Sequence, residues 1–139
     1  MKRNLIATFA LAVAAMVATT PATLAQQSQT KANVPFQFHV GHTSLAAGTY
    51  VIKAESGSKI EVLDRQTGHE IMALGNAETE RNAGNPRLVF HRYGSKYFLA
   101  EIWAGGGQGM VLPKTRQEQE YLASAQNAEP EQTVMLAMN

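Results

Sequence analysis

The sequence has 139 residues, with 12 Lys plus Arg, 11 Asp plus Glu and no cysteine. The lack of cysteine excludes a disulfide scaffold, a thiolate metal site and a cysteine nucleophile. The balanced charge, with no run of lysines or arginines, excludes the electrostatic footprint of a nucleic-acid-binding protein.

Residues 1–25 have the pattern of a secretory signal peptide. Two basic residues precede an uncharged apolar run over 5–18, and small residues follow it. This order predicts export and cleavage after Ala25, with a cut after Ala22 as the alternative. The apolar run is shorter than the roughly 20 residues of a spanning helix, which disfavours a retained membrane anchor. The remaining chain has the length of one domain, which we expect in the periplasm or outside the cell, without membrane contact.

Residues 26–33 are polar and lack an apolar period, so they predict a flexible lead-in to a single domain over 34–139. Apolar residues then alternate with polar ones from Val34 to Val40, which is typical of a strand with one buried face. Three further runs separated by short glycine-containing turns predict an antiparallel meander, over 49–53, 59–64 and 70–75.

The polar segment 76–86 is expected to be the longest loop, where binding surfaces are often built. The runs 88–92 and 97–103 flank a glycine-containing turn and are the most apolar part of the domain, so they predict the core hairpin. The glycine-rich segment 105–109 is expected to be a flexible loop. It lacks the Lys-Ser/Thr and the strand-to-helix frame of a phosphate-binding loop.

The last elements are a helix and a strand. Thr115 and Glu118 match a capping box, which predicts a surface helix over about 116–126. The apolar tail 133–138 predicts a final strand that closes the sheet. The pattern as a whole indicates an all-β, mainly antiparallel fold, either a small β-sandwich or a small β-barrel, with one short C-terminal helix.

Four motifs are similar to those of a known family, and they are VPFQFHVG from Val34, LAAGTY from Leu45, LVFHRYG from Leu88 and YFLAEIW from Tyr97. They resemble a family of short exported all-β proteins that are abundant in acidobacterial genomes and have no assigned function. The resemblance covers residues 34–116. Family members tend to have proline where this chain has Ala46, a difference that affects turn stiffness rather than chemistry. The resemblance implies export and a β fold, and it implies no mechanism.

A catalytic or metal site has little support in the sequence. His39 and His91 are the histidines considered for a metal, but a zinc site needs three or four converging ligands. The simpler interpretation places both on the polar faces of their strands. The serines lie in turns outside any Gly-x-Ser-x-Gly frame, and a chance pair of carboxylates proves nothing. We therefore expect no catalytic residue and no cofactor.

The aromatic residues offer a binding surface or a core. Tyr50, Tyr93, Tyr97 and Trp103 could bind a sugar ring or a peptide, although core packing is the favoured interpretation. Tyr93 lies at a turn and Trp103 at a strand end, so these two are expected to be the most exposed and are the candidate binding residues.

Three hypotheses of function follow. The first is an exported, non-catalytic β domain that binds a partner protein, a polysaccharide or a surface assembly. The second is a small β-barrel that binds an apolar ligand, and the third is a small metal-dependent or hydrolytic enzyme. Donation of the C-terminal strand to a neighbouring copy would produce an oligomer by strand addition.

Overall fold

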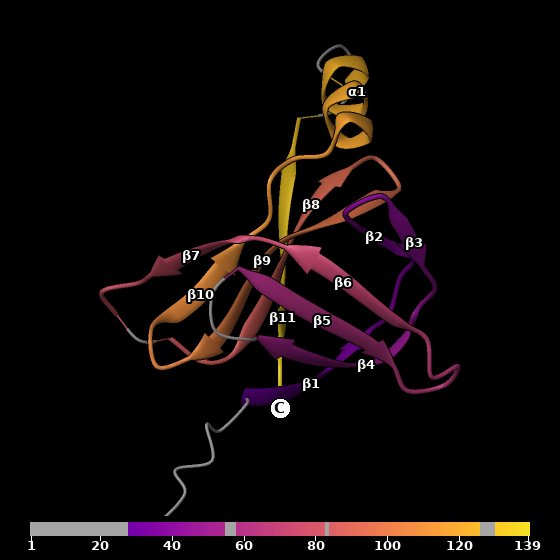
Figure 1. The fold of residues 1–139 in the computed structure, drawn as a ribbon. Coiled ribbons are helices and arrows are strands. Elements are labelled where there is room, and N and C mark those ends of the chain that lie inside the picture. Colours follow the sequence, from indigo (N-terminus) through magenta and orange to yellow (C-terminus); the bar gives the residue numbers. More distant parts are fainter. Residues whose placement is uncertain (1–27, 55–57, 83, 126–129) are drawn as a thin grey trace, which may run out of the picture.

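The computed structural model describes residues 28–54, 58–82, 84–125 and 130–139. Within these ranges the chain forms mostly antiparallel strands and a single helix (Figure 1). The predicted all-β class with one short C-terminal helix is confirmed. The signal-peptide segment 1–25 lies outside the described residues.

The strands form two sheets (Figure 1). The four-stranded sheet, which we call sheet A, contains in spatial order β1 (Ser28–Val34), β4 (Gly48–Ala54), β5 (Lys59–Asp64) and β6 (Glu70–Leu74). The larger sheet, sheet B, has in order β11 (Gln132–Ala137), β8 (Arg87–Tyr93), β9 (Lys96–Gly105), β10 (Gln108–Val111) and β7 (Asn76–Thr79). A short hairpin of β2 (Phe38–Val40) and β3 (Thr43–Leu45) joins sheet B through a parallel contact with β9.

The two sheets are connected at both margins. On one side Gly75 links β6 directly to β7, so the chain passes from sheet A to sheet B. On the other side Lys31 and Asn139 exchange two backbone hydrogen bonds of 2.9 and 3.0 Å. The sheets therefore curl into a half-barrel, which lies between the two predicted architectures (Figure 1).

The core lies between the sheets. Side chains alternate along each strand, so Tyr50 and Ile52 of β4 face Leu88 and Phe90 of β8 across the interior. The ring of Phe38 contacts those of Tyr50 and Phe90 edge to face, with centroid distances of 5.2 and 5.4 Å. Burying one such large side chain stabilises the fold by roughly 1.5–3 kcal/mol, so this core supports a domain without disulfides.

The first strand corrects the predicted lead-in. Residues 28–33 belong to β1, which pairs along its whole length with β4. Thr30, Ala32 and Val34 point inward and are buried, whereas the residues between them are exposed. The alternation is present, but threonine and alanine are too weakly apolar to mark it. The strand predicted from Val34 to Val40 is in fact divided, because β1 ends at Val34 and β2 begins at Phe38.

Two predicted loops are also partly strands. The first four residues of segment 76–86 form β7, which pairs with β10. The glycine-rich segment 105–109 is a tight turn between β9 and β10 rather than a flexible loop. Gly105, Gly106 and Gly107 have φ angles of 95°, 67° and 77°, which residues with a side chain rarely adopt. The glycines therefore allow the turn.

The single helix and the last strand complete sheet B. Helix α1 spans Arg116–Ala125, and residue 126 of the predicted helix is outside the described ranges. The backbone amide of Glu118 donates a hydrogen bond of 3.2 Å to the Thr115 hydroxyl, which caps the helix. Strand β11 pairs antiparallel with β8, where the sequence predicts a closing strand. In the described part of the chain, no helix combines the length and apolar character needed to cross a membrane.

Candidate functional site

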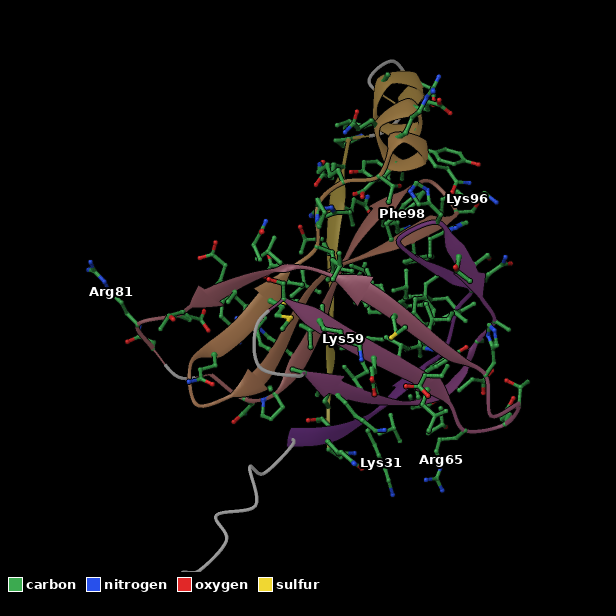
Figure 2. All side chains as sticks on the ribbon, viewed as in Figure 1. Lys31, Lys59, Arg65, Arg81, Lys96 and Phe98 are labelled. Atoms are coloured by element: carbon green, nitrogen blue, oxygen red, sulfur yellow. The ribbon has the colours of Figure 1, made fainter. Side chains whose placement is uncertain are left out.

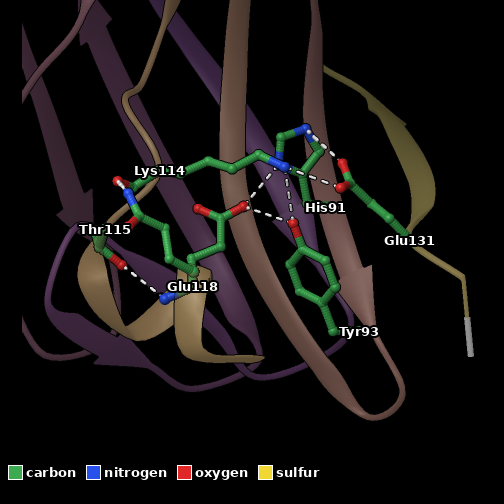
Figure 3. Close-up of polar contacts among 7 residues, drawn as sticks. His91, Tyr93, Lys114, Thr115, Glu118 and Glu131 are labelled. Carbon is green, nitrogen blue, oxygen red and sulfur yellow. Dashed lines mark hydrogen bonds and ion pairs between the residues drawn. The ribbon is translucent and has the colours of Figure 1, made fainter. Parts of the chain in front are cut away.

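A cluster of ionisable side chains lies on the outer face of sheet B, beside the first turn of α1 (Figure 3). We call it the His91 cluster, and its members are His91, Tyr93, Lys114, Glu118 and Glu131. The two β8 residues share a face because they are two positions apart. The other three come from the segment before α1, its first turn and the residue before β11. Four separate segments therefore meet at the cluster.

Glu118 is the centre of the cluster. Its carboxylate is buried, with 4 % of the residue exposed. One carboxylate oxygen, Oε1, lies 2.7 Å from His91 Nδ1 and accepts a hydrogen bond of 3.1 Å from the Tyr93 hydroxyl. The capped first turn of α1 holds Glu118 in this position. The sequence predicts Glu118 only as part of a capping box, whereas its carboxylate in fact faces the sheet.

Glu131 approaches His91 from the opposite side. Its Oε1 lies 3.5 Å from His91 Nε2, and its Oε2 accepts a hydrogen bond of 2.9 Å from Lys114 Nζ. Lys114 also donates to the Tyr93 hydroxyl, at 3.2 Å. Both nitrogens of the His91 ring therefore face carboxylates, and the charged groups of the cluster have partners inside it.

The protonation states of the cluster follow from these contacts. Burial, reinforced by the negative charge of Glu118, raises the pKa of Tyr93 to about 12 although the hydrogen bond from Lys114 opposes the rise. The hydrogen bond from Lys114 lowers the pKa of Glu131. Burial opposes the charge of Lys114, but its hydrogen bonds to Glu131 and Tyr93 prevail and raise its pKa. At neutral pH, Tyr93 is thus protonated and the Lys114–Glu131 pair is charged.

This arrangement links separate segments of the fold. The two ring nitrogens of His91 and the Lys114 ammonium have partners within the protein. The cluster therefore attaches α1 and the start of β11 to sheet B.

His39 and His91 do not converge on one site. In the register of sheet B, Phe98 of β9 pairs with His39 on one side and His91 on the other, so it separates them. The His39 ring is buried and stacks on Phe98 with a centroid distance of 4.8 Å. Figure 2 labels Phe98 and Lys96 in the region below α1. Burial, followed by the charge of Lys96, lowers the pKa of His39. His39 is therefore a neutral packing residue.

Because His39 and His91 lie apart, they do not form a shared metal site. In the described part of the chain, no group of three or more His, Asp or Glu residues is arranged to hold a metal ion. His39 Nδ1 has no hydrogen-bond partner among the described residues, but the atom is enclosed by the protein.

The predicted exposure of Tyr93 and Trp103 is wrong. Tyr93 is 3 % exposed and its hydroxyl belongs to the His91 cluster, while Trp103 is 9 % exposed. The indole N–H of Trp103 donates a hydrogen bond of 2.7 Å to Glu101, and the Arg87 guanidinium lies 5.0 Å from the ring. The ring also lies against Gly109, where an added Cβ would be 2.3 Å away. Because Gly109 has no side chain, the ring packs onto the sheet and offers no face to a sugar.

A second surface was not recognised in the sequence. Strand β6 is the last strand of sheet A, and two of its side chains, Met72 and Leu74, are 66 % and 72 % exposed on the outer face. Ile71 and Ala73, which alternate with them, pack against the core. The sequence of β6 indicates this surface, because the strand has apolar residues on both faces. In the His91 cluster, by contrast, nothing in the sequence marks Lys114 or Glu131.

Comparison of the chain with protein-family models, with curated proteins and with solved structures found no match in any of the three. The resemblance to the exported acidobacterial family therefore stays a prediction.

Proposed function

We propose that this chain is an exported, non-catalytic β domain that binds a partner protein, a polysaccharide or a surface assembly. The observation that carries this proposal is the β6 edge, which we define as Met72, Leu74 and the outward backbone of β6. Both side chains are about two-thirds exposed on a strand that has no further neighbour in sheet A among the described residues.

The β6 edge differs from an edge strand that is protected against contact. Proteins usually block such edges with lysine, proline or a bulge. Strand β6 has the sequence EIMAL, which contains none of these, and its ladder with β5 is regular. Covering Met72 and Leu74 would contribute roughly 1.5–3 kcal/mol for each side chain that is fully buried. A binding partner therefore gains both apolar contact and backbone hydrogen bonds here.

The non-catalytic part of the proposal is supported by the His91 cluster. It is the most extensive group of ionisable side chains described above, and its members bind one another. The apolar-ligand barrel and the small enzyme have no comparable observation in their favour. Export is supported by the signal-peptide pattern over residues 1–25.

Site-specific photo-crosslinking tests the binding function. A photoreactive amino acid is placed at Met72 in a bacterium that exports the chain, and the control carries it at Arg65, which is exposed on the turn between β5 and β6. We expect a discrete covalent adduct at position 72 and not at position 65. Equal labelling at the two positions, or none at position 72, would contradict the proposal.

A further inference from the structure

We propose that the β6 edge binds the β6 edge of a second copy of this chain, about a two-fold axis that passes through Met72. This inference rests on the proposed binding function and names the partner. Its first basis is the hydrogen-bond phase of β6. Asp64 N donates to His69 O at 2.9 Å, and Gly75 N donates to Ser58 O at 2.8 Å, one bond at each end of the β5–β6 ladder.

These two bonds determine which backbone groups are directed outward. In an antiparallel ladder, hydrogen-bonded and non-hydrogen-bonded pairs alternate. The register of the β5–β6 ladder and the two end bonds place Ile71 and Ala73 in hydrogen-bonded pairs with β5. The N–H and C=O groups of Glu70, Met72 and Leu74 therefore point toward the open edge. The residues with exposed apolar side chains also present the backbone groups available for pairing.

This pattern is self-complementary. The two-fold axis of an antiparallel strand pair passes through the centre of a residue pair, which is either hydrogen-bonded or non-hydrogen-bonded. Here the pair on the axis is Met72 with Met72 of the second copy, and it is hydrogen-bonded. Pairing Met72 with its symmetry mate places Glu70 opposite Leu74 of the second copy, and Leu74 opposite Glu70. All three outward residues then find a partner, and sheet A continues into the sheet of the second copy.

The charges on the outer face agree with this register. Lys59 of β5 is the cross-strand neighbour of Leu74, and it lies on sheet A in Figure 2. In the paired sheet, the row continues from Lys59 through Leu74 to Glu70 of the second copy. Strands are about 4.8 Å apart, so the basic and acidic residues are separated by roughly 10 Å between Cα atoms, within the combined reach of their side chains. Each copy thus places an acid in line with a base of the other, and this base, Lys59, also forms an ion pair of 2.8 Å with Glu61 of its own strand.

The hydrogen-bond phase and the charge arrangement together indicate that the partner is a second copy of the chain. An unrelated strand could pair with the β6 edge, but a second copy already combines the required hydrogen-bond phase and apolar centre of β6 with a basic residue, Lys59, on the adjacent β5. A five-residue strand pair is a small interface, so the dimer is expected to be weak and dependent on concentration.

Cysteine crosslinking tests the register directly, because the chain has no native cysteine. In a hydrogen-bonded antiparallel pair the Cα atoms are about 5.5 Å apart, a distance that a disulfide spans. The full chain with Met72→Cys should form a covalent dimer on mild oxidation. Leu74→Cys alone should not, whereas a mixture of Leu74→Cys and Glu70→Cys should form the mixed dimer.

Sedimentation of the full chain over roughly 1–500 µM, the range expected for a small interface, measures the association. Met72→Lys places two lysines opposite each other at the axis, so we expect at least a roughly tenfold weaker dimer. The matched control is Met135→Lys, because Met135 is 64 % exposed on β11 in the other sheet. It should leave the association unchanged. Thermal unfolding of both variants shows that they fold.

The outcomes separate this inference from the proposed function. A chain that stays monomeric, a Leu74→Cys dimer with itself, or an equal loss in Met135→Lys would overturn pairing about Met72. If the chain stays monomeric while a photoreactive residue at Met72 captures a different molecule, the second copy is the wrong partner and the binding function stands. If neither association nor capture is seen, both are wrong.

Discussion

Replacing Glu118 by alanine should destabilise the whole domain, because this buried carboxylate connects α1 to sheet B. The change removes the hydrogen bond from the Tyr93 hydroxyl and the contact with His91. It leaves the buried Tyr93 hydroxyl without this acceptor and the half-buried His91 ring without its closest carboxylate. Hydrogen bonds to charged groups contribute about 1.5–3 kcal/mol each, and the two losses are not fully additive because they share one oxygen. We expect the free energy of unfolding to fall by about 3 kcal/mol.

Urea and thermal unfolding followed by circular dichroism measure this loss. For a domain of this size, about 3 kcal/mol corresponds to a decrease in Tm of roughly 12 °C. Glu120→Ala is the matched control, because it lies in the same helix with a side chain 65 % exposed and paired only to Arg116 in the described contacts. That exposed pair is expected to contribute about 0.3–0.5 kcal/mol. If the two variants lose equal stability, Glu118 does not attach the helix to the sheet as described.

Three further changes have defined outcomes. Met138→Ala should lower the free energy of unfolding in urea by about 2–5 kcal/mol, because Met138 is buried in the core. Met135→Ala, at an exposed position, should change it by no more than about 0.5 kcal/mol, and equal effects of the two changes would contradict this. Gly109→Ala should cost about 1–3 kcal/mol and shift the fluorescence of the single tryptophan, because the new Cβ would overlap the indole ring, and an unchanged spectrum would refute that contact. The hydrogen bond from Lys114 lowers the pKa of Glu131, so the ionised Glu131 stabilises the fold above pH 4.5, its ordinary pKa, and this stability is lost as the pH falls below that value. The loss of stability in acid should be smaller in Glu131→Gln, and an identical dependence of stability on pH in the two proteins would contradict this.

The fold class could be predicted because most strands carry strong alternation of large apolar side chains. Strand β1 was missed because Thr30 and Ala32 give a faint pattern, and its pairing with β4 depends on a partner that is distant in the sequence. The segment of glycines before β10 was interpreted as flexible because composition reports the conformations that glycine permits, and not the single turn that the flanking strands select.

The candidate sites were less accessible to sequence reasoning. Tyr93 and Trp103 were assigned to the surface from their positions at a turn and a strand end, but burial depends on what packs over them. Helix α1 and Lys114 cover Tyr93, and the ring of Trp103 packs against Gly109, which has no side chain. The β6 edge could have been found, since β6 carries large apolar residues on both faces. That it is the last strand of its sheet depends on the long-range pairing.

The backbone pairing of Lys31 with Asn139 has a consequence for the order of folding. One margin of the half-barrel closes only when the start and the end of the domain meet, so the fold is incomplete while the C-terminal residues are still being synthesised. Contacts of such long sequence separation form slowly, because most of the chain must be ordered before they are made. The contact that closes this margin is therefore expected to form late in folding.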